Sequence, residues 1–451
     1  MLTPERPIVV IFVAVKNQDM ENFTPTKYKL LNLLTEREFD DLGWTLDDPE
    51  CCESTLIRAV YEKKRIDVKG EDWGVYRFAD WLPVNKMLKG SATPVTYKSV
   101  GLAKYLGCEN LYITFNGYFP EKGANMTTCS FKETEAYSVG GRMPENSGKV
   151  LVVASAGNTA RAFAKVCSEN NIPLLLCVPE DNIDALWFEK PLNDCVKLIA
   201  SQSGADYFDA IYLSQLALRS PKFFAEGGAK NVARRDGIGT TFLSATTTIG
   251  EIPDYYFQAV GSGTGAIAAW EANLRLIEDG RFGNKLAKLY VSQNYPFIPM
   301  YNAWKEDSRD IPYYSDRQAR KDVETINAKV LSNRKPPYGI KGGMYDAVKS
   351  SGGEVLHATN EQAEEAKKLF LEYEGIDIHC APAVALATLI ECLNNGTVDK
   401  DKIINLNITG GGEERYKKGK ELFYLKPSFV FGLEPDDKDV ITKSESLFGN
   451  I

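Results

Sequence analysis

Apolar runs alternate with helix-like stretches through the middle of the chain. The runs occupy residues 150–153, 172–178, 195–200, 256–260 and 289–292, and helix-like stretches begin at Ala160 and Ala266. Short apolar runs bounded by small polar residues are typical of strands buried on both faces. Strands that alternate with helices favour a parallel, doubly wound sheet, so the pattern predicts an α/β fold.

The patterns at the two ends of the chain are weaker. Residues 1–85 are rich in Glu, Asp, Lys and aromatic residues with little periodicity, which predicts short helices of no evident function. The apolar run 8–15 is too short to span a bilayer and favours a strand. The charged segment after Pro427 is expected to lie on the surface.

One helix start is marked by local chemistry alone. Thr359 and Gln362 have capping-box spacing, which predicts that a helix begins there. The apolar face of this helix is expected to be core and consists of Ala363, Ala366, Phe370 and Tyr373.

The length of 451 residues predicts two lobes plus an extension, because one hydrophobic core rarely serves so long a chain. We expect an N-terminal accessory region at 1–85, a large domain at 86–147 and 246–430, a small mobile domain at 148–245, and a C-terminal tail at 431–451. The apolar fraction of 44% and the charged fraction of 25% are those of a globular protein.

Charge and composition exclude several classes of function. A net charge of −8 argues against a nucleic-acid partner, and an anionic substrate would need a locally positive pocket.

The nine cysteines form no C-x-x-C pair, so we expect reduced thiols in the cytoplasm. With only His357 and His379, we expect no metal site and no serine triad, and we expect both histidines to be structural.

Lys132 ends the triplet Ser130-Phe131-Lys132 and precedes a helix-like stretch. Amide dipoles at a helix start disfavour an ammonium charge, which lowers the lysine pKa and favours imine formation. A solvated surface lysine is the alternative, because the triplet alone is not specific.

Two small-residue loops stand between a strand and a helix. The first consists of Ser155, Ala156, Gly157, Asn158 and Thr159. Its free N–H groups suit a carboxylate, and an ordinary N-capped turn is the alternative. The second consists of Gly261, Ser262, Gly263, Thr264 and Gly265. Bare amides and hydroxyls at this helix start predict a phosphate cradle.

The second loop also fits a dinucleotide-binding pattern, through Gly261, Gly263 and Ala266. The next strand, however, ends at 291–294 without the acidic residue that this pattern requires.

The fourth motif is the segment T-G-G-G, which begins with Thr409 after another apolar strand. The Thr409 hydroxyl could pair with a pyridine nitrogen. A plain strand-ending turn is equally compatible with the residues.

The four motifs, taken together and in their order along the chain, resemble those of the fold type II pyridoxal-phosphate enzymes, the superfamily of threonine synthase and cysteine synthase. The motifs are S-F-K, S-A-G-N-T, G-S-G-T-G and T-G-G-G. Thr93-Pro94, Leu102-Ala103 and Leu106-Gly107 resemble its opening segment, so the resemblance covers about residues 90–415. It implies a tryptophan synthase β-like fold of two doubly wound α/β domains, pyridoxal 5'-phosphate as cofactor, and a homodimer.

Within the superfamily, residues 111–133 and 154–163 most resemble the cysteate synthases. This resemblance implies a β-replacement in which O-phospho-L-serine and sulfite give L-cysteate and phosphate, through a lysine aldimine and an aminoacrylate. Residues 1–85 lack the cysteine-bearing, zinc-ribbon-like segment of the archaeal enzymes, which leaves the substrate open. The pathway served, coenzyme M or sulfonolipid synthesis, is also open.

The resemblance assigns a role to each motif. Lys132 would form the Schiff base and then act as general base. The loop 155–159 would hold the substrate carboxylate, with Asn158 at the cofactor's ring oxygen. The loop 261–265 would hold the cofactor phosphate, and Thr409 the pyridine nitrogen. A neutral hydroxyl at that nitrogen favours elimination over transamination.

The residue that contacts the substrate's phosphate or the sulfite is a separate question. Arg161 is the first candidate, with Lys341 or Lys104 behind it, and a surface salt bridge is the alternative for Arg161. The segment 334–343 resembles a loop that borders the substrate site of threonine synthases.

Three alternative functions remain open. The chain could be a threonine synthase that acts on O-phosphohomoserine with water, another phosphoserine-dependent β-replacement enzyme, or a non-catalytic homologue that kept the fold. The lysine and the complete set of cofactor motifs argue against the last.

Overall fold

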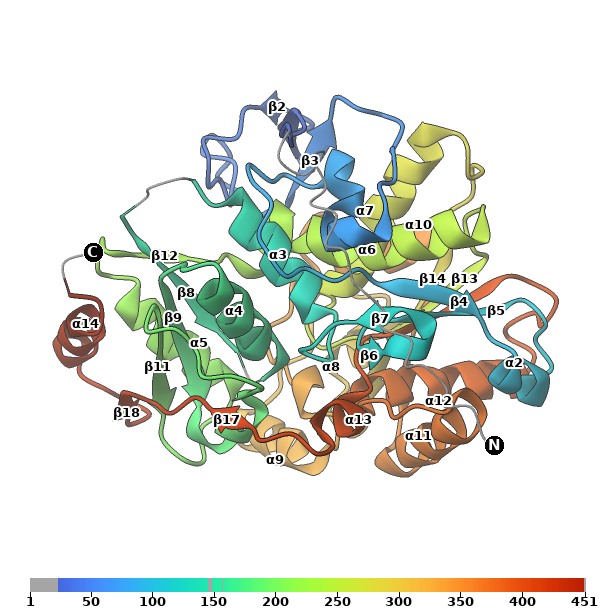
Figure 1. Ribbon diagram of the computed structural model, residues 1–451. Helices are drawn as coiled ribbons and strands as arrows, with labels where there is room; N and C mark the ends of the chain where they lie inside the picture. The colour runs from blue at the N-terminus through green and yellow to red at the C-terminus, as the bar shows by residue number, and fades with distance from the viewer. Residues whose placement is uncertain (1–22, 145–147, 156, 450–451) are drawn as a thin grey trace, which may run out of the picture.

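Two parallel sheets, each covered by helices, form the body of the molecule (Figure 1). The computed structural model describes residues 23–144, 148–155 and 157–449. The larger sheet has the order β15-β14-β13-β16-β5-β4, and all neighbours are parallel except the edge strand β4. Its strands are β4 (Val95–Lys98), β5 (Leu111–Phe115), β13 (Tyr255–Ala259), β14 (Lys288–Asn294), β15 (Glu354–Ala358) and β16 (Ile404–Ile408). The predicted α/β fold is confirmed.

The smaller sheet has the order β12-β8-β9-β11-β18 and is entirely parallel. Its strands are β8 (Val150–Ala154), β9 (Leu174–Pro179), β11 (Val196–Ser201), β12 (Phe223–Ala225) and β18 (Phe429–Phe431). Short antiparallel pairs join β6 (Tyr118–Phe119) to β7 (Ala124–Asn125) and β10 (Trp187–Phe188) to β17 (Phe423–Tyr424).

Helices connect the strands and cover both sheets. They are α2 (Gly101–Leu106), α3 (Lys132–Arg142), α4 (Asn158–Glu169), α5 (Tyr207–Ala217), α6 (Val232–Ile249), α7 (Thr264–Asp279), α8 (Pro299–Lys305), α9 (Asp316–Thr325), α10 (Met344–Ser351), α11 (Asn360–Glu374), α12 (Cys380–Asn394), α13 (Glu413–Lys417) and α14 (Asp437–Ser446). Single 3-10 turns are η2 (Pro120–Lys122), η3 (Glu180–Ala185), η4 (Gly228–Lys230) and η5 (Lys329–Leu331). Helix α11 begins with the predicted capping box between Thr359 and Gln362.

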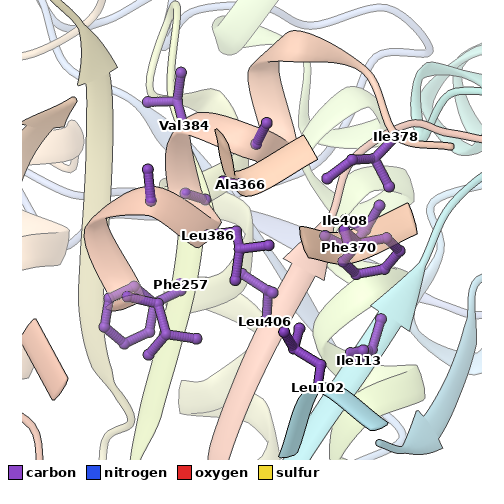
Figure 2. Close-up of a cluster of buried hydrophobic side chains, with 14 of the residues drawn as sticks. Leu102, Ile113, Phe257, Ala366, Phe370, Ile378, Val384, Leu386, Leu406 and Ile408 are labelled. Atoms are coloured by element: carbon purple, nitrogen blue, oxygen red, sulfur yellow. The ribbon is translucent and has the colours of Figure 1, made fainter. Parts of the chain in front are cut away.

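The central strands of the larger sheet are buried on both faces, as their apolar runs predict. On one face, Figure 2 shows Leu386 of α12 and Phe370 of α11 beside strand residues such as Leu406 and Ile408. The opposite face of the sheet is covered by α7 and α10. Because successive strand residues point to opposite faces, a strand between two helical layers must be apolar throughout.

The N-terminal region differs from its prediction. Its described residues form an antiparallel sheet of β1 (Tyr28–Asn32), β2 (Glu38–Phe39) and β3 (Ile57–Tyr61), followed by the 3-10 helix η1 (Glu71–Trp81). Alternate residues of β3 are buried, which is the period-two signal that the prediction of short helices missed. The expected strand at 8–15 lies outside the described residues.

The C-terminal segment also differs from its prediction. Strand β18 pairs with β11, so the predicted boundary at 430 falls inside a strand of the smaller sheet. Helix α14 packs on α5 at the edge of the smaller lobe (Figure 1), and Val440 and Phe448 are buried in the same core as Leu213 of α5. These apolar contacts make the segment part of the smaller lobe. Among the described residues, no helix is long and apolar enough to cross a membrane.

Candidate active site

A cavity of about 560 Å³ brings together residues from all four sequence motifs. Lys132, Asn158, Thr409 and the glycine-rich loop 261–265 all contribute to its wall. Three of these segments follow the carboxyl ends of β8, β13 and β16, where ligands bind in parallel sheets. The volume is in the range of small-molecule sites.

Lys132 is the first residue of α3 and is held beside Thr409 by the backbone. The N–H of Phe131 donates to the carbonyl of Thr409 at 3.0 Å, and Ser130 forms a β-bridge with Gly410. The Lys132 Nζ donates to Glu135 Oε2 at 2.9 Å. Burial lowers the pKa of Lys132, and the Glu135 carboxylate opposes that shift. A largely desolvated amine of lowered pKa is suited to imine formation.

The loop 261–265 needs its glycines because neighbouring atoms lie against it. A Cβ on Gly261 would lie 2.7 Å from the carbonyl oxygen of Val330, and one on Gly265 would lie 2.0 Å from Gln258 Nε2. Gly263 has a φ of +77°, which favours glycine. The hydroxyls of Ser262 and Thr264 lie 2.8 Å apart at the start of α7. Free amides and hydroxyls at a helix N-terminus can bind a phosphate dianion.

The loop before α4 places two polar side chains at the cavity. Ser155 Oγ accepts hydrogen bonds from the N–H groups of Gly157 and Ala160, both at 3.1 Å. Asn158 and Thr159 contribute to the cavity wall, and the Asn158 Oδ1 accepts from Arg161 Nη2 at 2.9 Å. Among the described residues, the Asn158 NH₂ group has no acceptor, which leaves it a donor for a ligand. Ala156, a predicted substrate contact, lies outside the described residues.

Arg161, the first candidate for contact with the substrate's phosphate or with sulfite, does not line this cavity. Its Nε and Nη2 donate to the carbonyl of Thr128 at 3.1 and 2.9 Å, and its Nη1 donates to that of Ala185 at 2.7 Å. The guanidinium also lies 3.2 Å from Glu413 Oε2 and 4.5 Å from the ring centroid of Trp187. Arg161 is therefore buried and hydrogen-bonded to protein groups, among them the side chain of Asn158.

The two reserve candidates also lie outside the cavity wall. Lys341 is exposed, and its backbone pairs with Thr55 of the N-terminal region. Lys104 is exposed on α2. The predicted contacts of these lysines with the substrate therefore have no support in the geometry.

The charge of the cavity wall contrasts with that of the whole chain. Among the described residues, the lining includes four cations and no carboxylate, although the chain has a net charge of −8. The cations are Lys132, Lys230, Arg234 and Lys335. Such a wall attracts anionic ligands, because Coulomb energies are larger where solvent is partly excluded.

Sequence reasoning missed several lining residues. Arg234 of α6 is paired with Glu226 through Nε at 2.8 Å and Nη2 at 2.6 Å, and Tyr207 of α5 also lines the cavity. The Gly227-Gly228 pair ahead of a helix was the one local signal for this segment. His379, predicted to be structural, also lines the cavity, with its Nε2 3.0 Å from Glu413 Oε2.

The N-terminal region contributes to the wall as well. Leu56 lines the cavity, and its N–H donates to the Lys341 carbonyl at 3.0 Å. Asp47 pairs with Lys230 at 2.7 Å, which fixes the loop after Gly227. No residue type or spacing in the sequence predicted these contacts. Across the described ranges, no group of His, Cys, Asp and Glu is arranged to hold a metal ion.

Comparison with known proteins agrees with this geometry. Residues 92–410 match the family model described as pyridoxal-phosphate dependent enzyme. The chain is 49% identical to the cysteate synthase of Methanosarcina acetivorans, over 84% of this chain and 92% of that protein. It is 43% identical to the cysteate synthase of Methanospirillum hungatei, over 93% and 98% of the two chains.

A solved structure, maize serine racemase, shares the fold. The TM-score is 0.55 at 14% identity, and the match covers 70% of this chain and 88% of the racemase. The tryptophan synthase β-like, fold type II architecture expected from the motifs is therefore confirmed. The protein is a pyridoxal-phosphate-dependent enzyme and belongs to the cysteate synthase family.

Proposed function

We propose that the protein replaces the phosphate of O-phospho-L-serine by sulfite and so forms L-cysteate and inorganic phosphate. One observation carries the proposal: a largely buried lysine and a phosphate cradle share a cavity whose described lining has four cations and no carboxylate. Both substrates are anions, and so are both products. The family name of the relatives supports cysteate as the product.

The residues of the cavity fit pyridoxal 5'-phosphate. The loop 261–265 and the start of α7 would hold its phosphate, and Lys132 its carbonyl carbon. Asn158 would donate to the ring oxygen. The Thr409 hydroxyl has no hydrogen bond to any described residue and would meet the pyridine nitrogen. When bound, the cofactor supplies an electron-withdrawing ring that makes the substrate's α-proton acidic.

Lys132 is the base of the proposed reaction. Its neutral amine removes the proton from the substrate's α-carbon, and the resulting ammonium lies beside Glu135, which stabilises its charge. The same ammonium can return the proton to the α-carbon after sulfite has added. One residue therefore serves both proton transfers.

The other side chains bind and orient the two substrates. The start of α4, with Ser155 and Thr159, would receive the substrate carboxylate. The cations of the wall would hold the phosphate as the C–O bond breaks, and then sulfite as the C–S bond forms. The proton of hydrogensulfite ends on the departing phosphate, so atoms and charges balance.

Product analysis tests the proposal against its alternatives. Purified holoenzyme is incubated with O-phosphoserine and sulfite, and separately with O-phosphohomoserine alone. Cysteate and phosphate formed in equal amounts are the expected result. Threonine from the second mixture would identify a threonine synthase instead, and no product from either would favour a non-catalytic homologue. Replacing sulfite by other nucleophiles tests for a different phosphoserine-dependent β-replacement.

In this role the chain is expected to act as a cytoplasmic homodimer that serves sulfonate biosynthesis. The dimer is supported by the fold type II architecture, and the reducing compartment by nine cysteines that are all free thiols. Light scattering on the purified holoenzyme gives the mass of the assembly. A mass near 50 kDa, that of one chain, would contradict the dimer.

A further inference from the structure

The four cations of the cavity wall differ in how far their charges are neutralised. Lys132 Nζ lies 2.9 Å from Glu135, Lys230 Nζ lies 2.7 Å from Asp47, and Arg234 Nη2 lies 2.6 Å from Glu226. The fourth, Lys335, has no carboxylate partner among the described residues. It is the lining cation whose full charge remains available to a ligand.

The loop that carries Lys335 is held between the two lobes. Leu331 anchors the loop in the core of the larger sheet. Arg334 forms an ion pair with Asp206, at the start of α5 in the smaller lobe, at 3.1 Å. Nearby, Arg320 of α9 binds both carboxylate oxygens of Asp209, at 3.0 and 3.1 Å. These ion pairs connect the lobes where Lys335 lies.

Lys335 is placed by its own contacts as well. Its N–H donates to Asn333 Oδ1 at 2.9 Å, and two prolines follow it. Its Nζ lies 4.9 Å from the ring centroid of Phe208, next to the cavity residue Tyr207. The adjacent Arg334 pairs with Asp206 and Asp316, so only one of these two neighbouring cations is free to bind an anion.

We propose that Lys335 forms the subsite that recognises the oxyanion of the substrates, the phosphate of the amino acid first and sulfite afterwards. The inference rests on the proposed function and adds the residue that makes the enzyme select phosphorylated over neutral leaving groups. An exposed lysine with a flexible stem can follow oxyanions of different size. Its ammonium gains a charge-assisted hydrogen bond without first breaking an ion pair.

Substitution of Lys335 has a matched control on the same loop. Lys341 is also exposed but lies outside the cavity wall, so Lys341→Gln reports the effect of removing one surface charge. Lys335→Gln is expected to lower kcat/KM for O-phosphoserine by about tenfold or more, the usual effect of losing a charged hydrogen bond. Lys341→Gln is expected to change it less than about twofold, in the range of a surface charge.

A substrate with a neutral leaving group distinguishes a loss of phosphate recognition from a general structural effect of the substitution. The ratio of kcat/KM for O-phosphoserine to that for O-acetylserine should fall in Lys335→Gln and recover in Lys335→Arg. Equal losses for both substrates, or equal behaviour of the Lys335→Gln and Lys341→Gln enzymes, would overturn the inference.

Binding of inorganic phosphate to the holoenzyme gives a second result that does not depend on turnover. Calorimetric titration should show phosphate binding about tenfold weaker in Lys335→Gln than in Lys341→Gln. If the wild-type enzyme formed no cysteate, the proposed function would fail, while this difference would still support an anion subsite. Unchanged phosphate affinity in Lys335→Gln, or no phosphate binding by the wild type, would reject the subsite.

Discussion

Lys132 Nζ and Glu135 Oε2 lie 2.9 Å apart on consecutive turns of α3. Glu135 is fully buried, and its other oxygen is 3.5 Å from Arg234 Nη1. Burial lowers the pKa of Lys132, Glu135 raises it, and Arg234 lowers it. Of the two buried carboxylates that favour the charged form of Lys132, Glu135 and Glu226, Glu135 has the larger effect and is hydrogen-bonded to the ammonium.

Glu135→Gln should lower the pKa of Lys132 further, because burial and Arg234 are then opposed only by the smaller effect of Glu226. A neutral amine is needed to attach the cofactor, so the pH profile for loading the apoprotein should move to lower pH. The rate at which visible absorbance appears, measured across pH, checks this. Glu133→Gln is the control, because Glu133 is buried on the same helix but accepts from Thr128. Identical profiles for both variants would contradict the role of Glu135.

Lys132→Ala should abolish the visible absorbance of the lysine-bound cofactor and nearly all cysteate formation. The reason is position: among the lining lysines of the described residues, Lys132 is the one whose backbone segment is held beside Thr409, whereas Lys230 and Lys335 are on other loops of the wall. Absorbance spectra and product assays on the purified variant provide the measurement. A variant that kept both signals would show that another lysine carries the cofactor.

Arg161→Leu should destabilise the protein by about 3 to 5 kcal/mol, the range for breaking a buried charged network. The substitution leaves the carbonyls of Thr128 and Ala185 without the Arg161 donor, and Glu413 keeps only His379 and Lys417 as charged partners. Denaturant unfolding of the apoprotein measures the loss. Lys443→Met is the control, because it removes an exposed pair with Asp439 and should cost at most about 1 kcal/mol. Similar losses in both variants would mean that Arg161 is not the buried anchor described above.

Glu413 should make stability depend on pH in the acidic range. Burial by itself would raise its pKa, but His379 and Arg161 outweigh burial and hold the pKa below its usual value. A carboxylate with a depressed folded pKa stabilises the protein above its unfolded pKa of about 4.3, and the stabilisation is lost as pH falls towards the folded value. Unfolding free energy should therefore decline below about pH 5, and Glu413→Gln should flatten the decline. An equally steep slope in the variant would contradict this assignment.

The sequence by itself determined the local features of this protein. The strand, loop and helix units around 150–169 and 255–279 follow from apolar periodicity, and the capping box at Thr359 follows from side chains three residues apart. Each signal arises within one turn or one strand, where neighbouring residues decide the backbone conformation. The lysine at a helix start, the glycine-rich loop and the threonine before the glycines were found for the same reason.

Only the tertiary structure decided which charges face the cavity. Arg161 is only three residues after Asn158. Its guanidinium nevertheless binds acceptors 24, 33 and 252 positions away in the sequence, namely Ala185, Thr128 and Glu413, and lies outside the cavity wall. In the part of the chain that the structure describes, Lys335 has no carboxylate partner, while Asp206 and Asp316 both pair with the adjacent Arg334. The sheet of residues 28–61 and strand β18 likewise depend on partners distant in the chain. Burial and pairing are properties of the assembled fold, because each is set by groups that come together only when the lobes pack.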